Sequence, residues 1–186
     1  MAIEPAHRRF TVDHYHRMAD IGILREDDRV ELIDGTVVQK SPIGGRHVTC
    51  VSRITRLLVS RLIDDAVVNV QSPVRLGEYQ EPEPDLAVVR NREYGNELPS
   101  ADDVFLLIEV SDSSLAYDRG TKLRLYARAG IPEFWLIDLP GEAIERHTNP
   151  SGDKYGVAVR AGRGEEIESP GVPGLVINTN DVLGKR

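Results

Sequence analysis

Two acidic residues interrupt apolar segments of the sequence and are the first candidates for chemistry. Asp85 opens the segment 85–89 directly after Pro84, and Glu109 is the one charged residue of the otherwise apolar segment 104–110. Carboxylates are rarely buried unless they are paired or bind a metal. Hard cations such as Mg²⁺ bind through one or two carboxylates together with substrate phosphate. If the two segments form adjacent strands, Asp85 and Glu109 would meet in a metal site.

Two further charged residues could complete such a site. Lys122 lies on the helix predicted after Glu109, where it could orient or deprotonate an attacking water and stabilise developing phosphate charge. Its spacing from Asp118 also fits an i,i+4 ion pair, which spacing alone slightly favours. Glu31 alternates with apolar neighbours on a predicted hairpin, so the pattern alone favours a solvent-facing position over a role in the site.

The elements that would position these residues follow from periodicity and turn signals. Thr11 can cap a helix that runs through Asp20. The pair Asp34-Gly35 predicts a two-residue β-hairpin, and apolar residues at helical spacing predict a helix over 47–63. The prolines at 82 and 84 exclude helix and central strand, and they lead the chain into the strand at Asp85.

Buried strands and one crossover helix dominate the rest of the chain. A helix over 117–129 joins the strands 104–110 and 133–138, which fits a parallel βαβ crossover. Shorter strands are predicted at 66–71, 72–76, 143–148 and 155–160, the last two as an antiparallel pair at an edge. The sum is an α/β fold with a mixed sheet, and the length of 186 residues predicts one domain over 1–186.

Composition narrows the class of protein. Cys50 is the only cysteine, so a disulfide within the chain is excluded. Neither a signal-peptide core nor a membrane-length apolar run is present, and we expect a cytoplasmic protein without membrane contact. The net charge of −7 argues against a protein that coats phosphates generally, but a bound cation would invert the local sign in a nuclease. We interpret most arginines of the two long predicted helices as parts of solvent-exposed helix faces.

Other reactive residue types have simpler explanations. Ser111, Ser113 and Ser114 lack the G-x-S-x-G motif of a serine hydrolase, and helix capping explains a serine there better. His47 begins a helix, where a surface position is favoured over a phosphate contact. Cys50 and Trp135 are expected in the core.

Several segments resemble the Uma-type restriction endonuclease family, a bacterial group once classed as a domain of unknown function. They lie between about Thr11 and a point beyond Leu175, and they read RVELIDGTVV, QSPVRL, EPEPDLAVV, IEVSDSSLAYDRGTKLRLYARAGIPEFWLID and VPGLVI. The resemblance implies a branch of the PD-(D/E)XK nuclease superfamily. It therefore implies a restriction-endonuclease-like fold, a mixed central β-sheet flanked by helices, with an N-terminal helix and β-hairpin.

The resemblance also implies which residues of this chain form the site. Pro84-Asp85 matches the PD, and Glu109 matches the acid of the second half-motif. Ser111 stands where the superfamily has lysine, and Lys122 on the following helix matches the displaced lysine. Glu31 matches the upstream acid that often completes the site. The remaining matches, without a defined role, are Asp118 and Tyr126, and the role of Gln71 is undecided.

Together these features predict a metal-dependent endonuclease that hydrolyses DNA phosphodiester bonds. Asp85, Glu109 and Glu31 would bind Mg²⁺, with Mn²⁺ as a substitute, and Lys122 would orient the attacking water. The resemblance further implies a homodimer or higher homo-oligomer. The alternatives are a catalytically silent nuclease-fold module that binds nucleic acid or a protein partner, and a hydrolase of small phosphate esters.

Overall fold

A six-stranded mixed sheet forms the centre of the computed structural model, which describes residues 8–25, 27–62 and 66–184. Its strands lie in the order β3-β4-β5-β6-β7-β8, and only β5 and β6 are parallel within it. The strands are β3 (Ala66–Val70), β4 (Leu86–Arg90), β5 (Val104–Ser111), β6 (Glu133–Asp138), β7 (Ala143–Ser151) and β8 (Lys154–Gly162). The predicted mixed sheet, its parallel crossover and its antiparallel edge pair β7–β8 are confirmed.

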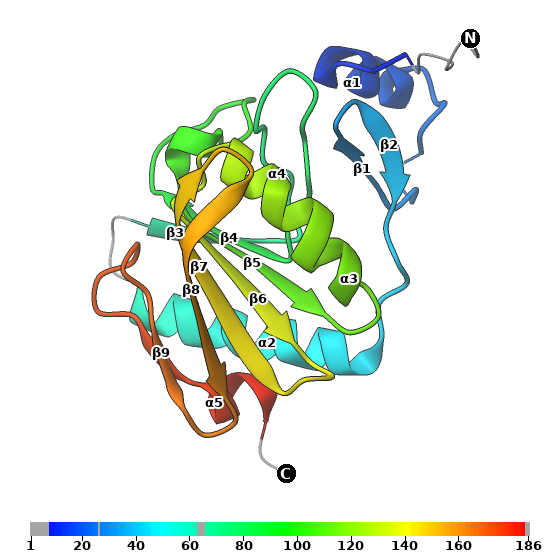
Figure 1. Ribbon diagram of the computed structural model, residues 1–186. Helices are drawn as coiled ribbons and strands as arrows, with labels where there is room; N and C mark the ends of the chain where they lie inside the picture. Colours follow the sequence, from blue (N-terminus) through cyan, green and yellow to red (C-terminus); the bar gives the residue numbers. More distant parts are fainter. Residues whose placement is uncertain (1–7, 26, 63–65, 185–186) are drawn as a thin grey trace, which may run out of the picture.

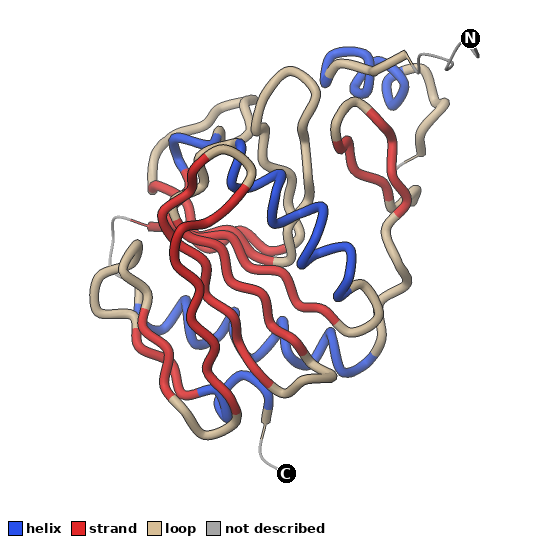
Figure 2. Tube along the Cα trace, viewed as in Figure 1, coloured by secondary structure: helices blue, strands red, loops and turns tan. Residues whose placement is uncertain are grey.

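Helices cover both faces of this sheet (Figures 1 and 2). The long helix α2 (Gly45–Arg61) packs on one face. The crossover between β5 and β6 packs on the other, and it consists of α3 (Leu115–Tyr117), the π-helical turn η2 (Asp118–Lys122) and α4 (Leu123–Arg128). The crossover helix therefore begins two residues before its predicted start at 117 and contains a π turn that periodicity did not predict. For α2, the predicted end at 63 lies outside the described residues.

The pleat of β4 and β5 decides where the acidic residues point. Ala87 and Leu107 are directly paired across these antiparallel strands, and both pack in the core on the α4 side. Side chains two residues apart on a strand share a face. The next pair in this register is Asp85 and Glu109, so both acids lie at the same end of the strands and on the same face as the π turn.

The N-terminal part of the chain closes this end of the sheet. Thr11 caps α1 (Val12–Asp20) as predicted, accepting from the His14 backbone N–H. The hairpin of β1 (Val30–Ile33) and β2 (Thr36–Gln39) turns at Asp34 and Gly35, which both have positive φ as a type I′ turn requires. Backbone hydrogen bonds between Leu32 and Glu81 tie the hairpin to the segment that leads into Asp85.

The C-terminal part packs beside α2. It contains β9 (Glu166–Glu168), β10 (Val176–Asn178) and α5 (Thr179–Leu183), and its apolar residues join the core beneath α2. A short 3₁₀ turn, η1 (Ala101–Asp103), precedes β5. The strand predicted at 72–76 is wrong. Pro73 has no N–H to donate, and the amides of Val74 and Arg75 bond to Pro82 and Pro99 instead of a neighbouring strand. No helix within the described ranges has the length and apolarity to cross a membrane.

Candidate active site

The four residues singled out in the sequence line one pocket of about 520 Å³. The hairpin β1–β2, the N-terminal end of α2, the end of β5 and the π turn enclose it. Although they border a cavity, Glu31 and Lys122 are only 3% exposed, Glu109 is 6% exposed and Asp85 is 7% exposed. The structure therefore brings all four together, and it buries each charged group almost completely.

Lys122 joins two of the acids. Its ammonium donates to Oε2 of Glu31 at 2.6 Å and to Oε1 of Glu109 at 3.2 Å. These two carboxylates raise the pKa of Lys122 against the effect of burial, which lowers it, so the side chain stays charged. Within the described residues Lys122 forms no ion pair with Asp118, and the pairing that spacing favoured is wrong. The π turn and the buried acids of two strands give the ammonium closer partners.

Glu31 corrects the expectation of a solvent-facing residue. Besides Lys122, its Oε2 accepts the backbone N–H of Glu83 at 3.2 Å. The segment that contains Glu83 and the π turn that carries Lys122 cover this face of the hairpin. Strand alternation predicted the face correctly, but it could not show that other elements lie over it.

Glu109 is held by Tyr126 as well as Lys122. The Tyr126 hydroxyl donates to Oε1 at 2.5 Å, the same oxygen that Lys122 contacts. Burial raises the pKa of Glu109 to about 8, with Lys122 opposing this effect and the carboxylates of Asp118, Asp85 and Glu31 adding to it. Tyr126, whose role was open in the sequence, thus positions the Glu109 carboxylate.

Asp85 is oriented by three elements. Its Oδ2 accepts the backbone N–H of Val110 at 2.8 Å and lies 2.9 Å from Nε2 of His47, while Gln71 approaches Oδ1 at 3.4 Å. Burial acts to raise the pKa of Asp85, but the hydrogen bond and charge of His47, the Val110 amide and the charge of Lys40 together outweigh it, and the pKa is lowered. Asp85 is therefore ionised at neutral pH. Gln71, with a positive φ of 45°, also donates its backbone N–H to the Asp85 carbonyl at 3.0 Å.

His47 and Tyr117 are site residues that the sequence did not identify. The hydrogen bond to Asp85 raises the pKa of His47, and its Nδ1 is buried without a hydrogen-bond partner among the residues described. The Tyr117 hydroxyl is likewise buried without such a partner at the pocket wall.

Asp118 has a separate role from Lys122. Its Oδ2 accepts the hydroxyls of Ser111 at 2.6 Å and Ser114 at 2.5 Å. Burial raises the pKa of Asp118 against these two hydrogen bonds. Ser111, at the usual lysine position of the superfamily, thus fixes the π turn. The expected side-chain cap by Ser114 is wrong, because its hydroxyl is used by Asp118 instead.

The donor set suits a hard divalent cation held by two carboxylates. Oδ1 of Asp85 has only the long contact from Gln71, and Oε2 of Glu109 has no hydrogen bond within the described part of the chain. Mg²⁺ commonly takes one or two carboxylates and completes its shell with water and phosphate. No group of three or more His, Cys, Asp or Glu side chains that could hold a metal occurs in the described ranges. The fit therefore rests on Asp85 and Glu109, with Glu31 facing Lys122.

The sheet, its flanking helices and a pocket of acids around one lysine are the features expected of a restriction-endonuclease-like protein. Residues 12–180 match the family Uma2, described as "Putative restriction endonuclease". The chain belongs to this family. No curated protein matches it.

A solved structure supports the fold. It is described as a "putative nuclease belonging to DUF820" from Anabaena variabilis ATCC 29413. The two chains are 19% identical, with a TM-score of 0.72 over 94% of this chain and 97% of the other. At this identity the likeness establishes a shared fold, and the chemistry has to be argued from the pocket itself.

Proposed function

We propose that the protein is a metal-dependent endonuclease that hydrolyses DNA phosphodiester bonds in the pocket described above. Asp85 and Glu109 would hold Mg²⁺, or Mn²⁺ in its place, and Lys122 would orient the attacking water. One observation carries the proposal: a buried lysine ammonium bridges two carboxylates in the same pocket as a third, ionised one. Family membership supports nuclease chemistry and nucleic acid as the substrate class.

Each residue has a task that its contacts permit. A bound Mg²⁺ would polarise the scissile phosphate and lower the pKa of a coordinated water. Lys122 stays protonated, so it acts as a hydrogen-bond donor and positive charge rather than as a base. Two of its three N–H groups point to Glu31 and Glu109. The third can donate to water or to a phosphate oxygen in the pocket.

Glu31 would serve the site in two ways. Its Oε2 fixes Lys122, as the 2.6 Å contact permits. Its Oε1 has no hydrogen bond among the residues that the structure covers, which leaves this oxygen for the metal shell. His47 would keep Asp85 ionised and oriented, because the hydrogen bond between them lowers the pKa of the Asp85 carboxyl.

Nicking of supercoiled plasmid in Mg²⁺ or Mn²⁺ tests the proposal. We expect nicking by the wild type, a loss of about 100-fold or more in Asp85→Ala and Lys122→Ala, and no change in Asp153→Ala, which removes an exposed acid in the β7–β8 turn. Calorimetric titration with Mn²⁺ gives a second readout. Asp85→Ala should lose binding, while Lys122→Ala should keep it. Circular dichroism verifies that each variant is folded.

The same experiment separates the proposal from a catalytically silent module. Two observations favour the silent module: Lys122 already pairs with Glu31 and Glu109, and the described residues contain no three-ligand group. Absence of nicking across metals and nucleic acids, with partner affinity unchanged in Asp85→Ala, would establish that alternative. Nicking that survives Asp85→Ala would come from a contaminant and would remove the site assignment.

A further inference from the structure

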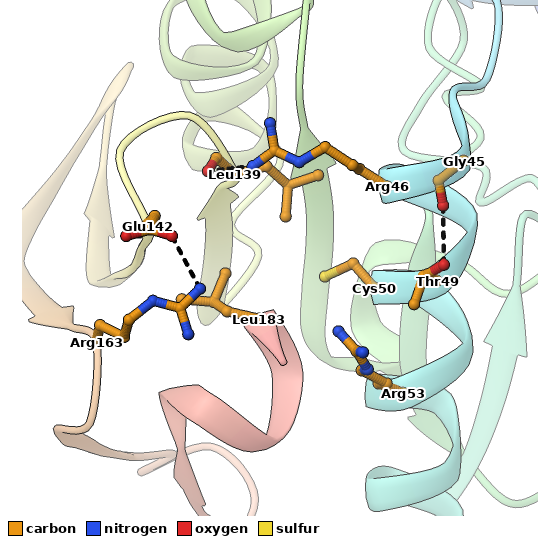
Figure 3. Close-up of a pocket in the computed structure, with 9 residues that line it drawn as sticks. All are labelled: Gly45, Arg46, Thr49, Cys50, Arg53, Leu139, Glu142, Arg163 and Leu183. Carbon is orange, nitrogen blue, oxygen red and sulfur yellow. Dashed lines mark hydrogen bonds and ion pairs between the residues drawn. The ribbon is translucent and has the colours of Figure 1, made fainter. Parts of the chain in front are cut away.

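A second pocket, of about 280 Å³, lies along the N-terminal half of α2 (Figure 3). It is bordered by α2, by the turn between β6 and β7, and by α5. Its charged lining consists of the guanidinium groups of Arg46, Arg53 and Arg163 and the carboxylate of Glu142. Three positive charges against one negative charge make this pocket cationic, although the whole chain carries a net charge of −7.

The three arginines differ in how far they are neutralised. Arg46 donates to the Leu139 carbonyl at 3.0 Å and lies 3.6 Å from the Asp112 carboxylate. Arg163 pairs with Glu142 at 2.9 Å. Arg53 has no hydrogen bond or ion pair within the described part of the chain, and Figure 3 shows its guanidinium pointing into the pocket.

Arg53 is partly buried and lies against the last turn of the described chain. Its guanidinium packs against the backbone of Gly184 so closely that a Cβ added there would lie 2.2 Å from the Arg53 terminal nitrogen. The Cys50 thiol beside it is buried, and burial raises the pKa of Cys50 to about 12, so it supplies no negative charge at neutral pH. The pocket's carboxylate, Glu142, pairs with Arg163, and Arg53 has no ion pair among the described residues, so its guanidinium is available to an anion.

We propose that this pocket binds a backbone phosphate of the nucleic acid whose cleavage we assign to the active-site pocket. The planar guanidinium fork matches phosphate oxygens in two parallel hydrogen bonds. Arg53 would be the principal contact, with Arg46 and Arg163 adding positive charge at the rim. The identity of the anion in this inference rests on the proposed function. The position of the anion rests on the placement of the arginines.

The two pockets are adjacent along the same helix. Gly44 lines the active-site pocket and Gly45 lines the arginine pocket. Asp112, the ion-pair partner of Arg46, also lines the active-site pocket. The N-terminus of α2, whose cap residue Gly44 makes no side-chain cap, adds a positive dipole end between them. A strand whose scissile phosphate occupied the first pocket could place a neighbouring phosphate in the second.

Fluorescence anisotropy of a labelled DNA duplex in EDTA, at several salt concentrations, tests this pocket without catalysis. The variants are Arg53→Gln, Arg53→Lys, and the control Arg56→Gln, an exposed arginine of the same helix outside the pocket. We expect Arg53→Gln to weaken binding roughly 3- to 10-fold and to reduce the slope of log K against log salt by about 0.9, the value of one phosphate contact. Arg53→Lys should weaken it less, and Arg56→Gln should change little.

The outcomes separate this proposal from the nuclease assignment. Equal effects of Arg53→Gln and Arg56→Gln, or no duplex binding by the wild type, would overturn the phosphate pocket whatever the nicking assay shows. Duplex binding that depends on Arg53, without nicking, would support the phosphate pocket and contradict the nuclease proposal. Inorganic pyrophosphate that raises the melting temperature of the wild type but not of Arg53→Gln, with duplex affinity unchanged, would make this a small-anion site and overturn the strand contact.

Discussion

Lys122 allows several charged side chains to be buried together. Burying an isolated ion is costly, and a buried pair offsets that cost only when its geometry is good and the other lone pairs are satisfied. Here the ammonium contacts Glu31 and Glu109 together, and Tyr126 donates a further hydrogen bond to Glu109. The acids depend on one cation, so removing it should affect stability as well as the proposed chemistry.

At the residue scale we therefore predict that Lys122→Met lowers the free energy of unfolding by about 3–5 kcal/mol at neutral pH, the cost of breaking a buried ion pair. Glu31→Gln in the same chain should recover part of this loss, because it removes one carboxylate left without a partner. Urea denaturation measures both changes. Lys154→Met, at an exposed lysine, is the matched control. A loss no larger than that of the control would mean that the ion pairs are not stabilising.

The sequence predicted the residues that break a pattern and missed those that depend on a neighbour. Asp85 and Glu109 stood out because Asp85 opens an apolar segment and Glu109 interrupts one. Glu31 and His47 did not, because periodicity gives the face of an element and not what packs over it. Their burial depends on the segment around Glu83 and on the approach of α2 to the strand end.

At the scale of elements, Glu133 attaches the C-terminal segment to the sheet. This acid, at the start of β6, is fully buried and accepts the Ser169 hydroxyl at 2.8 Å, the Gly171 amide at 2.8 Å and the Trp135 indole N–H at 2.5 Å. Burial raises the pKa of Glu133 against these three donors. The approach is close, since a Cβ on Gly171 would lie 2.7 Å from the carboxylate.

We predict that Glu133→Ala detaches this segment before the sheet itself opens. Each buried donor left without an acceptor costs about 1–3 kcal/mol. Hydrogen–deuterium exchange should show faster exchange at the amides of Ser169 and Leu175, with β5 still protected. Glu168→Ala, an exposed acid of the same segment, is the control. Uniform acceleration across the whole chain would contradict a local role.

The order and direction of the elements were predictable, whereas their local departures from regularity were not. The crossover between β5 and β6 follows from two apolar strands around an amphipathic segment. The π turn over 118–122 does not, because it brings Asp118 to two serines and Lys122 to two distant acids. Such a turn is specified by contacts across the fold rather than by spacing along the chain.

At the scale of the whole molecule, the acids gathered around Lys122 should make global stability depend on pH. Burial raises the pKa of Glu109 from 4.5 to about 8. Between these values the folded chain keeps a proton that the unfolded chain releases, so the free energy of unfolding falls as pH rises. The raised pKa of Asp118 acts in the same direction, and so does that of His47, whose contribution is lost above its folded pKa. Asp85, with a lowered pKa, loses its contribution only in acid.

Glu109→Gln isolates the largest part of this effect, because glutamine resembles the protonated acid and can still accept from Tyr126 and Lys122. In EDTA, we expect the variant and the wild type to have similar unfolding free energies near pH 4.5, the ordinary pKa of a glutamate. Their unfolding free energies should diverge toward about pH 8, where the variant becomes the more stable. Each unit of pKa shift corresponds to about 1.4 kcal/mol, so urea denaturation across this range resolves the difference. Glu166→Gln, at an exposed acid, should follow the wild type at every pH. Parallel curves for Glu109→Gln and the wild type would mean that Glu109 is ionised in the folded chain throughout, with Lys122 outweighing its burial.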